Sequence, residues 1–193
     1  FHAALLLPSC AALGAWLKHA AAAATELEGA SDHGVSHAIY FSDPDGNGLE
    51  FYADLPRTTW PRSATGELAM VTRRLDVPAL LAAASPDSPT PLLSAVWGHL
   101  HLRVTDLARS DTFYRTTLGM ELMQCSYPGA RFLAADGYHH HVALNTWGYP
   151  RLARPSAALG LVEATFARTA AGQSAPQSLN DPDGIALRVT NLT

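Results

Sequence analysis

The chain has 193 residues, 48% of them hydrophobic, and a formal net charge of -4. A chain of this length and composition buries a core in one or two domains. It has no cluster of basic residues, which argues against nucleic acid or an anionic membrane as a partner, and no stretch that is long and uncharged enough to span a bilayer.

Two cysteines, Cys10 and Cys125, lie far apart in the sequence and do not form a disulfide framework. Their number and spacing predict a reducing, cytoplasmic setting. Residues 1–24 superficially resemble a signal peptide, but Pro8 and Lys18 interrupt the apolar run and no basic region precedes it. We therefore interpret this segment as a strand followed by a helix. Because the chain starts at Phe1 in what looks like the middle of a strand, we expect it to be a fragment.

The first part of the chain predicts a strand, a helix and further strands. Residues 2–7 are apolar enough for a strand, and Ser9 offers a helix cap. Apolar residues then recur at helical spacing, at Ala12, Leu13, Trp16, Leu17 and Ala20. Two more strands are predicted at residues 38–41 and 49–52.

The turn Asp43-Pro44-Asp45-Gly46 joins these last two strands. Proline presets its own φ and glycine tolerates a positive φ, so the segment predicts a tight hairpin that fixes Tyr40 relative to Glu50. Alternation turns Glu50 to the opposite face from Leu49 and Phe51. A carboxylate on the inward face of a sheet needs a cation or hydrogen-bond donors, whereas on a wet face it needs neither. The hairpin alone does not decide whether Glu50 faces inward with a partner or outward into solvent.

The rest of the chain repeats this plan. Residues 57–95 form a connection, with one or two short helices in 66–84 and a link rich in Pro and Ser from 85 to 91. A strand at 99–104, a helix between Asp106 and Gly119, and strands at 122–126, 131–134 and 139–145 follow. A third, shortened copy has strands at 159–166 and 185–190 around a second Asp-Pro-Asp-Gly turn. Residues 169–180 look too short and polar for the helix and extra strands of the other copies.

The order His33, Ile39-Tyr40, Asp43-Pro44, Gly46 and Glu50 resembles the signature of the ring-cleaving extradiol dioxygenases. These enzymes belong to the vicinal oxygen chelate superfamily, together with glyoxalase I and the bleomycin-resistance proteins, and the chain is most similar to the catechol-2,3-dioxygenase-like branch. Ser31 departs from the pattern, which usually has Gly, Asn, Thr or an aliphatic residue there. The match is more specific for the superfamily than for ring cleavage.

The resemblance implies an α+β fold of repeated βαβββ modules, whose curved mixed sheets surround a cavity. It also implies four modules in a complete relative, paired two and two. We therefore expect residues 1–56 to be one module whose partner is missing, residues 57–95 to be a helical linker, and residues 96–193 to be a second domain with a shortened last module.

Alternation along two strands predicts where a metal would bind. His2 shares a face with Ala4, and His99 with His101, while the leucines between them must face the helices. Two histidines and one carboxylate on neighbouring strands form the triad that holds Fe(II) with open positions. The resemblance gives His2 and Glu50 ligand positions, and His99 sits where a ligand would lie in its own module. The remaining histidine for His2 and Glu50 is expected from the missing module, so the prediction is that this chain alone binds iron weakly.

The resemblance also implies catalytic residues. His33 and Tyr40 match positions that orient a bound phenolate or oxygen species, and the run His139 to His141 matches the segment that supplies an acid–base histidine, here His140 or His141. The alternatives are a loop histidine, a buried strand tyrosine and a surface strand rich in histidine. In the shortened copy, Leu187 or Arg188 falls where a glutamate ligand would be, so no complete triad is expected in the second half.

The function implied is Fe(II)-dependent cleavage of a small aromatic diol by O2, in the catabolism of aromatic compounds. One alternative is a glyoxalase-like isomerase or lyase that uses Mn, Ni or Zn. A second is a metal-free binding protein with a groove lined by Trp97, Phe132 and Trp147, and a third is an inactive fragment. The cavity faces left exposed by the missing module favour pairing between two chains, so we also expect a homodimer. The sequence contains no phosphate loop, nucleophile elbow or dinucleotide fingerprint.

Overall fold

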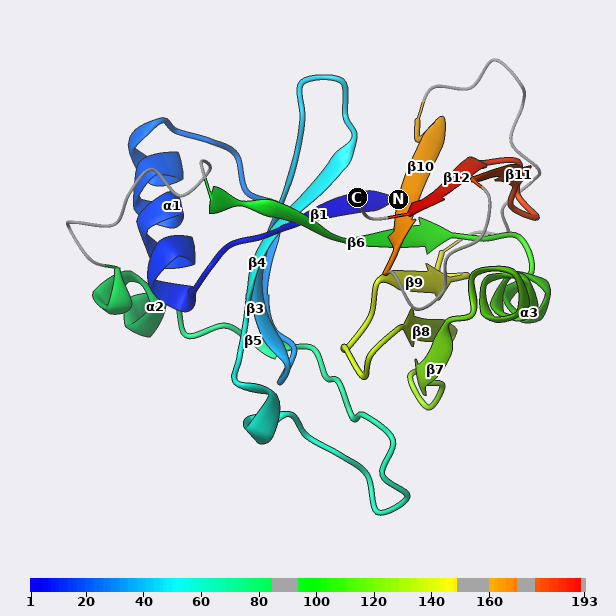
Figure 1. Ribbon diagram of the computed structural model, residues 1–193. Helices are drawn as coiled ribbons and strands as arrows, with labels where there is room; N and C mark the ends of the chain where they lie inside the picture. The colour runs from blue at the N-terminus through cyan, green and yellow to red at the C-terminus, as the bar shows by residue number, and fades with distance from the viewer. Residues whose placement is uncertain (85–93, 149–159, 170–175, 192–193) are drawn as a thin grey trace.

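Residues 1–84, 94–148, 160–169 and 176–191 are described by a computed structural model (Figure 1). The first unit consists of β1 (His2–Leu6), α1 (Cys10–Ala22), β2 (Gly29–Asp32), β3 (Ser36–Ser42) and β4 (Gly48–Asp54). The second unit consists of β6 (Val96–Arg103), α3 (Leu107–Leu118), β7 (Glu121–Gln124), β8 (Ala130–Ala134) and β9 (Val142–Asn145). The predicted strand–helix–three-strand plan is therefore present twice.

The connection between these units contains a short 3-10 helix (Arg57–Thr59), β5 (Arg73–Arg74) and α2 (Val77–Ala83). Of the one or two helices expected in residues 66–84, only α2 is present. Residues 66–75 are not helical, and Arg73–Arg74 among them form β5, which pairs with β2. The predicted link at 85–91 lies outside the described residues. None of the described helices has the length and apolar character that crossing a membrane requires.

The last part of the chain forms a separate three-stranded sheet of β10 (Glu163–Arg168), β12 (Ala186–Asn191) and β11 (Gln177–Asn180), in that order. Residues 169–180 were expected to be too short and polar for the helix and extra strands of the other copies, but their last four residues form one such strand. Those residues form β11, because they pair antiparallel with β12 across the second Asp-Pro-Asp-Gly turn. Residues 170–175 and Leu159 lie outside the described part of the chain.

The strand β1 lies at the middle of a nine-stranded sheet with the order β5-β2-β3-β4-β1-β6-β9-β8-β7. It runs parallel to β4 on one side and antiparallel to β6 on the other, so it joins the two units into one sheet (Figure 1). The helices α1 and α3 lie at opposite ends of this sheet. The division into 1–56, 57–95 and 96–193 stays a prediction.

One face of the sheet packs against the helices. Trp16 of α1 stacks on Phe41 and contacts Phe51, and Leu7 and Leu13 join the same core. In the second unit, Leu102 and Val104 pack with Tyr114 of α3. The leucine-bearing faces of β1 and β6 therefore cover the helices as predicted, which leaves the histidine-bearing faces on the other side of the sheet.

The helix termini follow the sequence signals. The Ser9 hydroxyl accepts from the amide of Ala12 at the start of α1, and the Asp106 carboxylate accepts from the amide of Arg109 at the start of α3. Gly119 ends α3 with a φ of 71°, a left-handed conformation that favours glycine.

The strands β3 and β4 form the predicted hairpin. Asp43 accepts from the amides of Asp45 and Asn47 within the turn, and Gly46 adopts a φ of 81°. The hairpin fixes Tyr40 relative to Glu50 as predicted, and its register places the two residues directly opposite each other.

A β-bulge at Gly98 interrupts the pairing of β1 with β6. Ala4 pairs with His99, but Leu5 pairs with Trp97, so Gly98 is an extra residue in β6. A side chain at Gly98 would meet the hydroxyl of Tyr52 at 2.0 Å, so only glycine leaves room for that ring. Because paired residues share a face, the bulge turns Trp97 to the helix-side face of Leu5, away from His99.

Candidate metal centre

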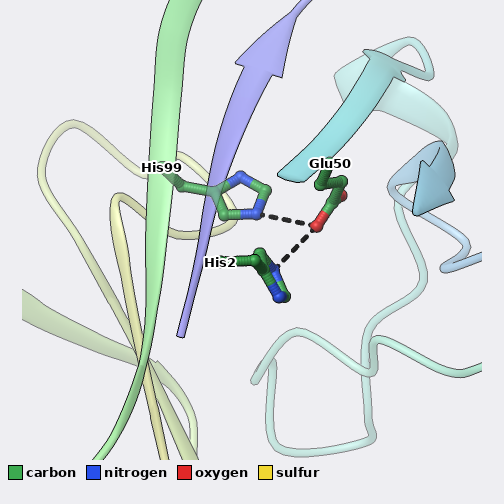
Figure 2. Close-up of side chains that lie close together, drawn as sticks. All are labelled: His2, Glu50 and His99. Atoms are coloured by element: carbon green, nitrogen blue, oxygen red, sulfur yellow. Dashed lines mark hydrogen bonds and ion pairs between the residues drawn. The ribbon is translucent and has the colours of Figure 1, made fainter. Parts of the chain in front are cut away.

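Three strands bring His2, Glu50 and His99 together on the open face of the sheet. Ala4 of β1 pairs with Glu50 of β4 on one side and with His99 of β6 on the other. Ala4, Glu50 and His99 therefore lie in one row across the sheet, and their side chains point to the same face. The small side chain of Ala4 leaves space in which the carboxylate and the imidazole meet above the central strand. His2, two residues earlier on β1, reaches the same space (Figure 2).

The ligand atoms of these residues lie at distances that a metal ion requires. The Nε2 atoms of His2 and His99 lie 2.9 and 3.3 Å from Oε2 of Glu50, and one ligand atom from each residue lies within 4.8 Å of the others. Metal–ligand bonds of about 2.0–2.2 Å at right angles separate neighbouring ligand atoms by about 3 Å. The distances to Glu50 match that separation.

Burial at this cluster leaves polar atoms that a cation would satisfy. The side chains of Glu50 and His99 are 3% and 2% exposed. Although Nε2 of His2 lies 2.9 Å from Oε2 of Glu50, it is buried and has no hydrogen-bond partner among the described residues. A buried nitrogen without a partner is costly in free energy, and a divalent cation would use its lone pair. The residues therefore fit a metal site.

Glu50 is ionised in this environment. Burial by itself raises the pKa of the Glu50 carboxyl, but attraction to His99 and the close imidazole nitrogens of His2 and His99 outweigh it and hold the pKa well below its ordinary value. A carboxylate that stays charged at neutral pH supplies the negative charge that a divalent ligand set needs.

The sequence led us to expect the second imidazole from outside the chain. The structure has it at His99 instead, because β6 of the second unit pairs with β1 in the place where the missing module was expected. Sequence spacing could not reveal this pairing, since His2 and His99 are 97 positions apart in the chain.

His33 and Tyr40 meet beside the metal cluster. Nε2 of His33 lies 2.7 Å from the Tyr40 hydroxyl, and Nδ1 of His33 lies 2.7 Å from the carbonyl oxygen of Val71. Because a carbonyl only accepts, Nδ1 of His33 donates to Val71, and Nε2 of His33 is the nitrogen that pairs with the Tyr40 hydroxyl. Burial, and then the charge of Glu50, raise the pKa of the Tyr40 hydroxyl, so it remains protonated.

The predicted histidine strand is shorter than expected. The strand β9 begins at Val142, whereas residues 139–141 precede it, after a turn in which the amide of Tyr138 donates to the carbonyl of Ala135. The three histidines are therefore outside the strand that was predicted at residues 139–145. His140 faces the cavity beside the metal cluster, with its ring 4.1 Å from that of His99. His141 lies away from it, and its Nδ1 accepts from the amide of Ala135.

A buried hydrogen-bond chain fixes the protons of His140. Nε2 of His139 lies 3.0 Å from Oδ1 of Asp54, and Nδ1 of His139 lies 2.7 Å from Nδ1 of His140. The carboxylate only accepts, so His139 is protonated at Nε2 and its Nδ1 accepts from Nδ1 of His140. Burial lowers the pKa of His139 to about 4 and the pKa of His140 well below its ordinary value, so both rings are neutral. The proton of the neutral His140 ring is consequently on Nδ1, and its Nε2 is unprotonated.

Two tyrosines extend this chain. The hydroxyls of Tyr52 and Tyr138 lie 2.8 Å apart, and the Tyr138 hydroxyl donates to Asp54 across 3.2 Å. Sequence reasoning did not select Asp54, Tyr52 or Tyr138 as site residues. The available signal was alternation on β4, which places Asp54 and Tyr52 on the same face as Glu50.

These groups line a cavity of about 500 Å³. Its polar wall contains His2, Glu50, His99, His33, Tyr40 and His140. The remaining wall is largely apolar and includes Met70, Phe132 and Trp147. Trp97, which was expected to line a groove with Phe132 and Trp147, is on the other face of the sheet because of the bulge at Gly98, and its side chain is largely exposed.

Sequence and structure comparisons identify the family. No model of a known protein family matches the chain. The chain is 42% identical over 165 residues to a protein named catechol-2,3-dioxygenase from Bacillus subtilis (strain 168), which covers 83% of this chain and 57% of that protein. The structure of a candidate dioxygenase from Bacillus subtilis subsp. subtilis str. 168 matches 98% of this chain and 61% of its own, with a TM-score of 0.58 and 10% identity. The chain belongs to the vicinal oxygen chelate superfamily.

This vicinal oxygen chelate chain thus has the predicted α+β fold, with repeated βαβββ units and a curved mixed sheet beside a cavity. A glyoxalase I mutant from Zea mays aligns less well, with a TM-score of 0.48 at 15% identity over 99% of this chain and 68% of its own. The chain spans 57% of its Bacillus subtilis relative.

Proposed function

We propose that the chain holds a divalent metal, iron(II) in the first instance, through His2, Glu50 and His99, and that the site cleaves a catecholic ring oxidatively. The observation that carries the proposal is the convergence of two imidazoles and one carboxylate within 4.8 Å in the wall of a cavity. Two histidines and one carboxylate are the ligand set of non-heme iron oxygenases. When bound, iron(II) supplies Lewis acidity toward the two substrate hydroxyls and open positions for them and for O2.

His140 is the proposed base. Its bare Nε2 belongs to a neutral ring that faces the cavity, and its ring lies directly against that of His99. Nε2 of His140 would accept the proton of a substrate hydroxyl and return it during ring opening. Asp54 would act through His139 as a positioning residue, because the hydrogen bonds along this chain hold the proton of His140 on Nδ1. His141, the other predicted candidate, has no part in this proposal.

Tyr40 and His33 are proposed to orient the substrate. The Tyr40 residue lies opposite Glu50, its hydroxyl is held 2.7 Å from Nε2 of His33, and both side chains line the cavity. A substrate hydroxyl that donates to this oxygen would be held beside the metal ligands.

The test begins with metal binding and oxygen uptake. The protein would be purified without oxygen, loaded with Fe(II), and mixed with catechol and O2. We expect about one Fe(II) per chain, one O2 consumed per ring lost, and both oxygen atoms of labelled O2 in the product. Glu50→Gln should lose iron and oxygen uptake together. The exposed Glu26→Gln provides a matched control that should lose neither.

Other outcomes would replace this proposal. Oxygen-independent turnover with Mn, Ni or Zn would favour a glyoxalase-like isomerase or lyase. Ligand affinity that is unchanged by a chelator would favour a metal-free binding protein. No metal, ligand or oxygen uptake at all would favour an inactive chain. The cytoplasmic setting, a homodimer and a role in aromatic catabolism remain proposals from composition and resemblance.

A further inference from the structure

The cavity contains a buried polar group that the proposed chemistry does not use. His101 follows His99 by two residues on β6, so both side chains face the cavity. The His101 residue is 9% exposed, and within the described part of the chain its Nε2 has no hydrogen-bond partner. Buried polar atoms are usually paired, so an unpaired one in a cavity wall is a place where a ligand recovers free energy.

The surroundings of His101 define one end of the cavity. Its ring lies 4.8 Å from that of His2, on the side of the metal cluster, and 5.2 Å from that of Trp147, on the far side. Phe132 packs at 6.2 Å. His101 therefore bridges the metal end of the cavity and an aromatic wall that suits the face or edge of a planar ring.

The other polar groups at this end are already paired. The hydroxyls of Tyr127 and Thr72, both in the cavity wall, lie 3.0 Å apart and hydrogen-bond to each other. Nε2 of His101 is thus the group that gains most from a ligand.

The charge of the wall restricts that ligand. Among the described residues, no lysine or arginine lines the cavity, and its one carboxylate is Glu50. An anionic substituent would lose its hydration without meeting a side-chain cation, which is costly. An uncharged group that donates or accepts a hydrogen bond would meet a partner in His101.

We propose that this end of the cavity is a subsite for an uncharged polar substituent, such as a carbonyl or hydroxyl, on the ring of the substrate. His101 Nε2 forms the hydrogen bond, and Phe132 and Trp147 flank the substituted edge of the ring. The inference rests on the proposed function, because the diol at the metal cluster sets the direction in which the ring extends toward His101.

The test compares catechols that differ only in the group beside the diol. Calorimetric titration under argon, with the full chain loaded with Fe(II), would give Kd for catechol and for its methyl, acetyl and carboxylate derivatives. We expect the acetyl compound to bind about tenfold more tightly than the methyl compound, as one recovered hydrogen bond allows. The carboxylate should bind more weakly than either.

His101→Phe retains an aromatic ring and removes both nitrogens. This variant should lose the tenfold preference for the acetyl group, with the Kd of the methyl compound unchanged within about twofold. His101→Gln, which retains a donor and an acceptor, should keep part of the preference. The exposed His19→Phe is the matched control and should bind as the unmodified protein does.

The outcomes separate this inference from the proposed function. Binding of every catechol with no preference for the acetyl group, or tightest binding of the carboxylate, would overturn the subsite alone. Failure of catechol itself to bind would overturn the proposed function. Since the comparison of ligands uses the unmodified protein, it decides the question even if His101→Phe does not fold.

Discussion

Acidification from pH 7 to pH 5 should lower the free energy of unfolding, because His139 is buried as a neutral imidazole. Burial lowers the pKa of His139 from 6.5 to about 4 in the folded protein. Between these two values the unfolded chain binds a proton that the folded protein does not. The free energy of unfolding therefore has its full value above pH 6.5 and falls as the pH is lowered toward 4.

The magnitude follows from the size of the shift. This difference in the pKa of His139 lowers the free energy of unfolding by about 3 kcal/mol over the whole pH range between the two pKa values. Between pH 7 and pH 5 it lowers the free energy of unfolding by about 2 kcal/mol. Burial also lowers the pKa values of His140 and His101, which act in the same direction. The contribution of His139 is therefore a lower bound on the total loss.

Urea unfolding at both pH values, followed by tryptophan fluorescence in the presence of a chelator, measures this loss without a contribution from metal binding. His139→Gln should flatten the pH dependence by about 2 kcal/mol. His19→Gln, at an exposed helix position, should leave it unchanged. Equal stability of the unmodified protein at pH 7 and pH 5, or an unchanged pH dependence in His139→Gln, would refute the assignment of His139 as a buried neutral ring.

Three substitutions test other parts of the account. In Asp54→Asn the new amide can donate to Nε2 of His139, which should move the proton of His140 from Nδ1 to Nε2. The nitrogen NMR shifts of the His140 ring report its tautomer. An unchanged tautomer would contradict the hydrogen-bond chain. Gly98→Ala should lower the free energy of unfolding in urea by about 1–3 kcal/mol, because its Cβ meets the Tyr52 hydroxyl at 2.0 Å. An unchanged free energy of unfolding would contradict the close contact between Gly98 and Tyr52. Ala4→Leu fills the space above β1 and should weaken Fe(II) binding by at least about tenfold in a competition titration with a chelator, with folding retained by circular dichroism.

The sequence predicted local features of the fold well. The hairpin turn, the caps at Ser9 and Asp106, and the helix end at Gly119 depend on residues close together in the chain, and all are present. Alternation correctly assigned the faces of β1 and β6, because the leucines must cover the helices.

Features that depend on distant contacts were not predictable in the same way. The pairing of β1 with β6, which supplies His99 to His2 and Glu50, joins strands from two units. The bulge at Gly98 reverses the face of Trp97, and period-two reasoning has no signal for one inserted residue. The chain from Asp54 to His140 depends on an irregular segment before β9, where strand alternation does not apply.

The central claim is that His2, Glu50 and His99 together hold a divalent ion. Elemental analysis of the anaerobically Fe(II)-loaded protein after dialysis, with each of the three ligands changed in turn to His2→Ala, Glu50→Gln and His99→Ala, tests it most directly. We expect about one iron per chain in the unmodified protein and a large loss in every variant, including His99→Ala. Iron retained in full by His99→Ala, or by Glu50→Gln, would contradict the account.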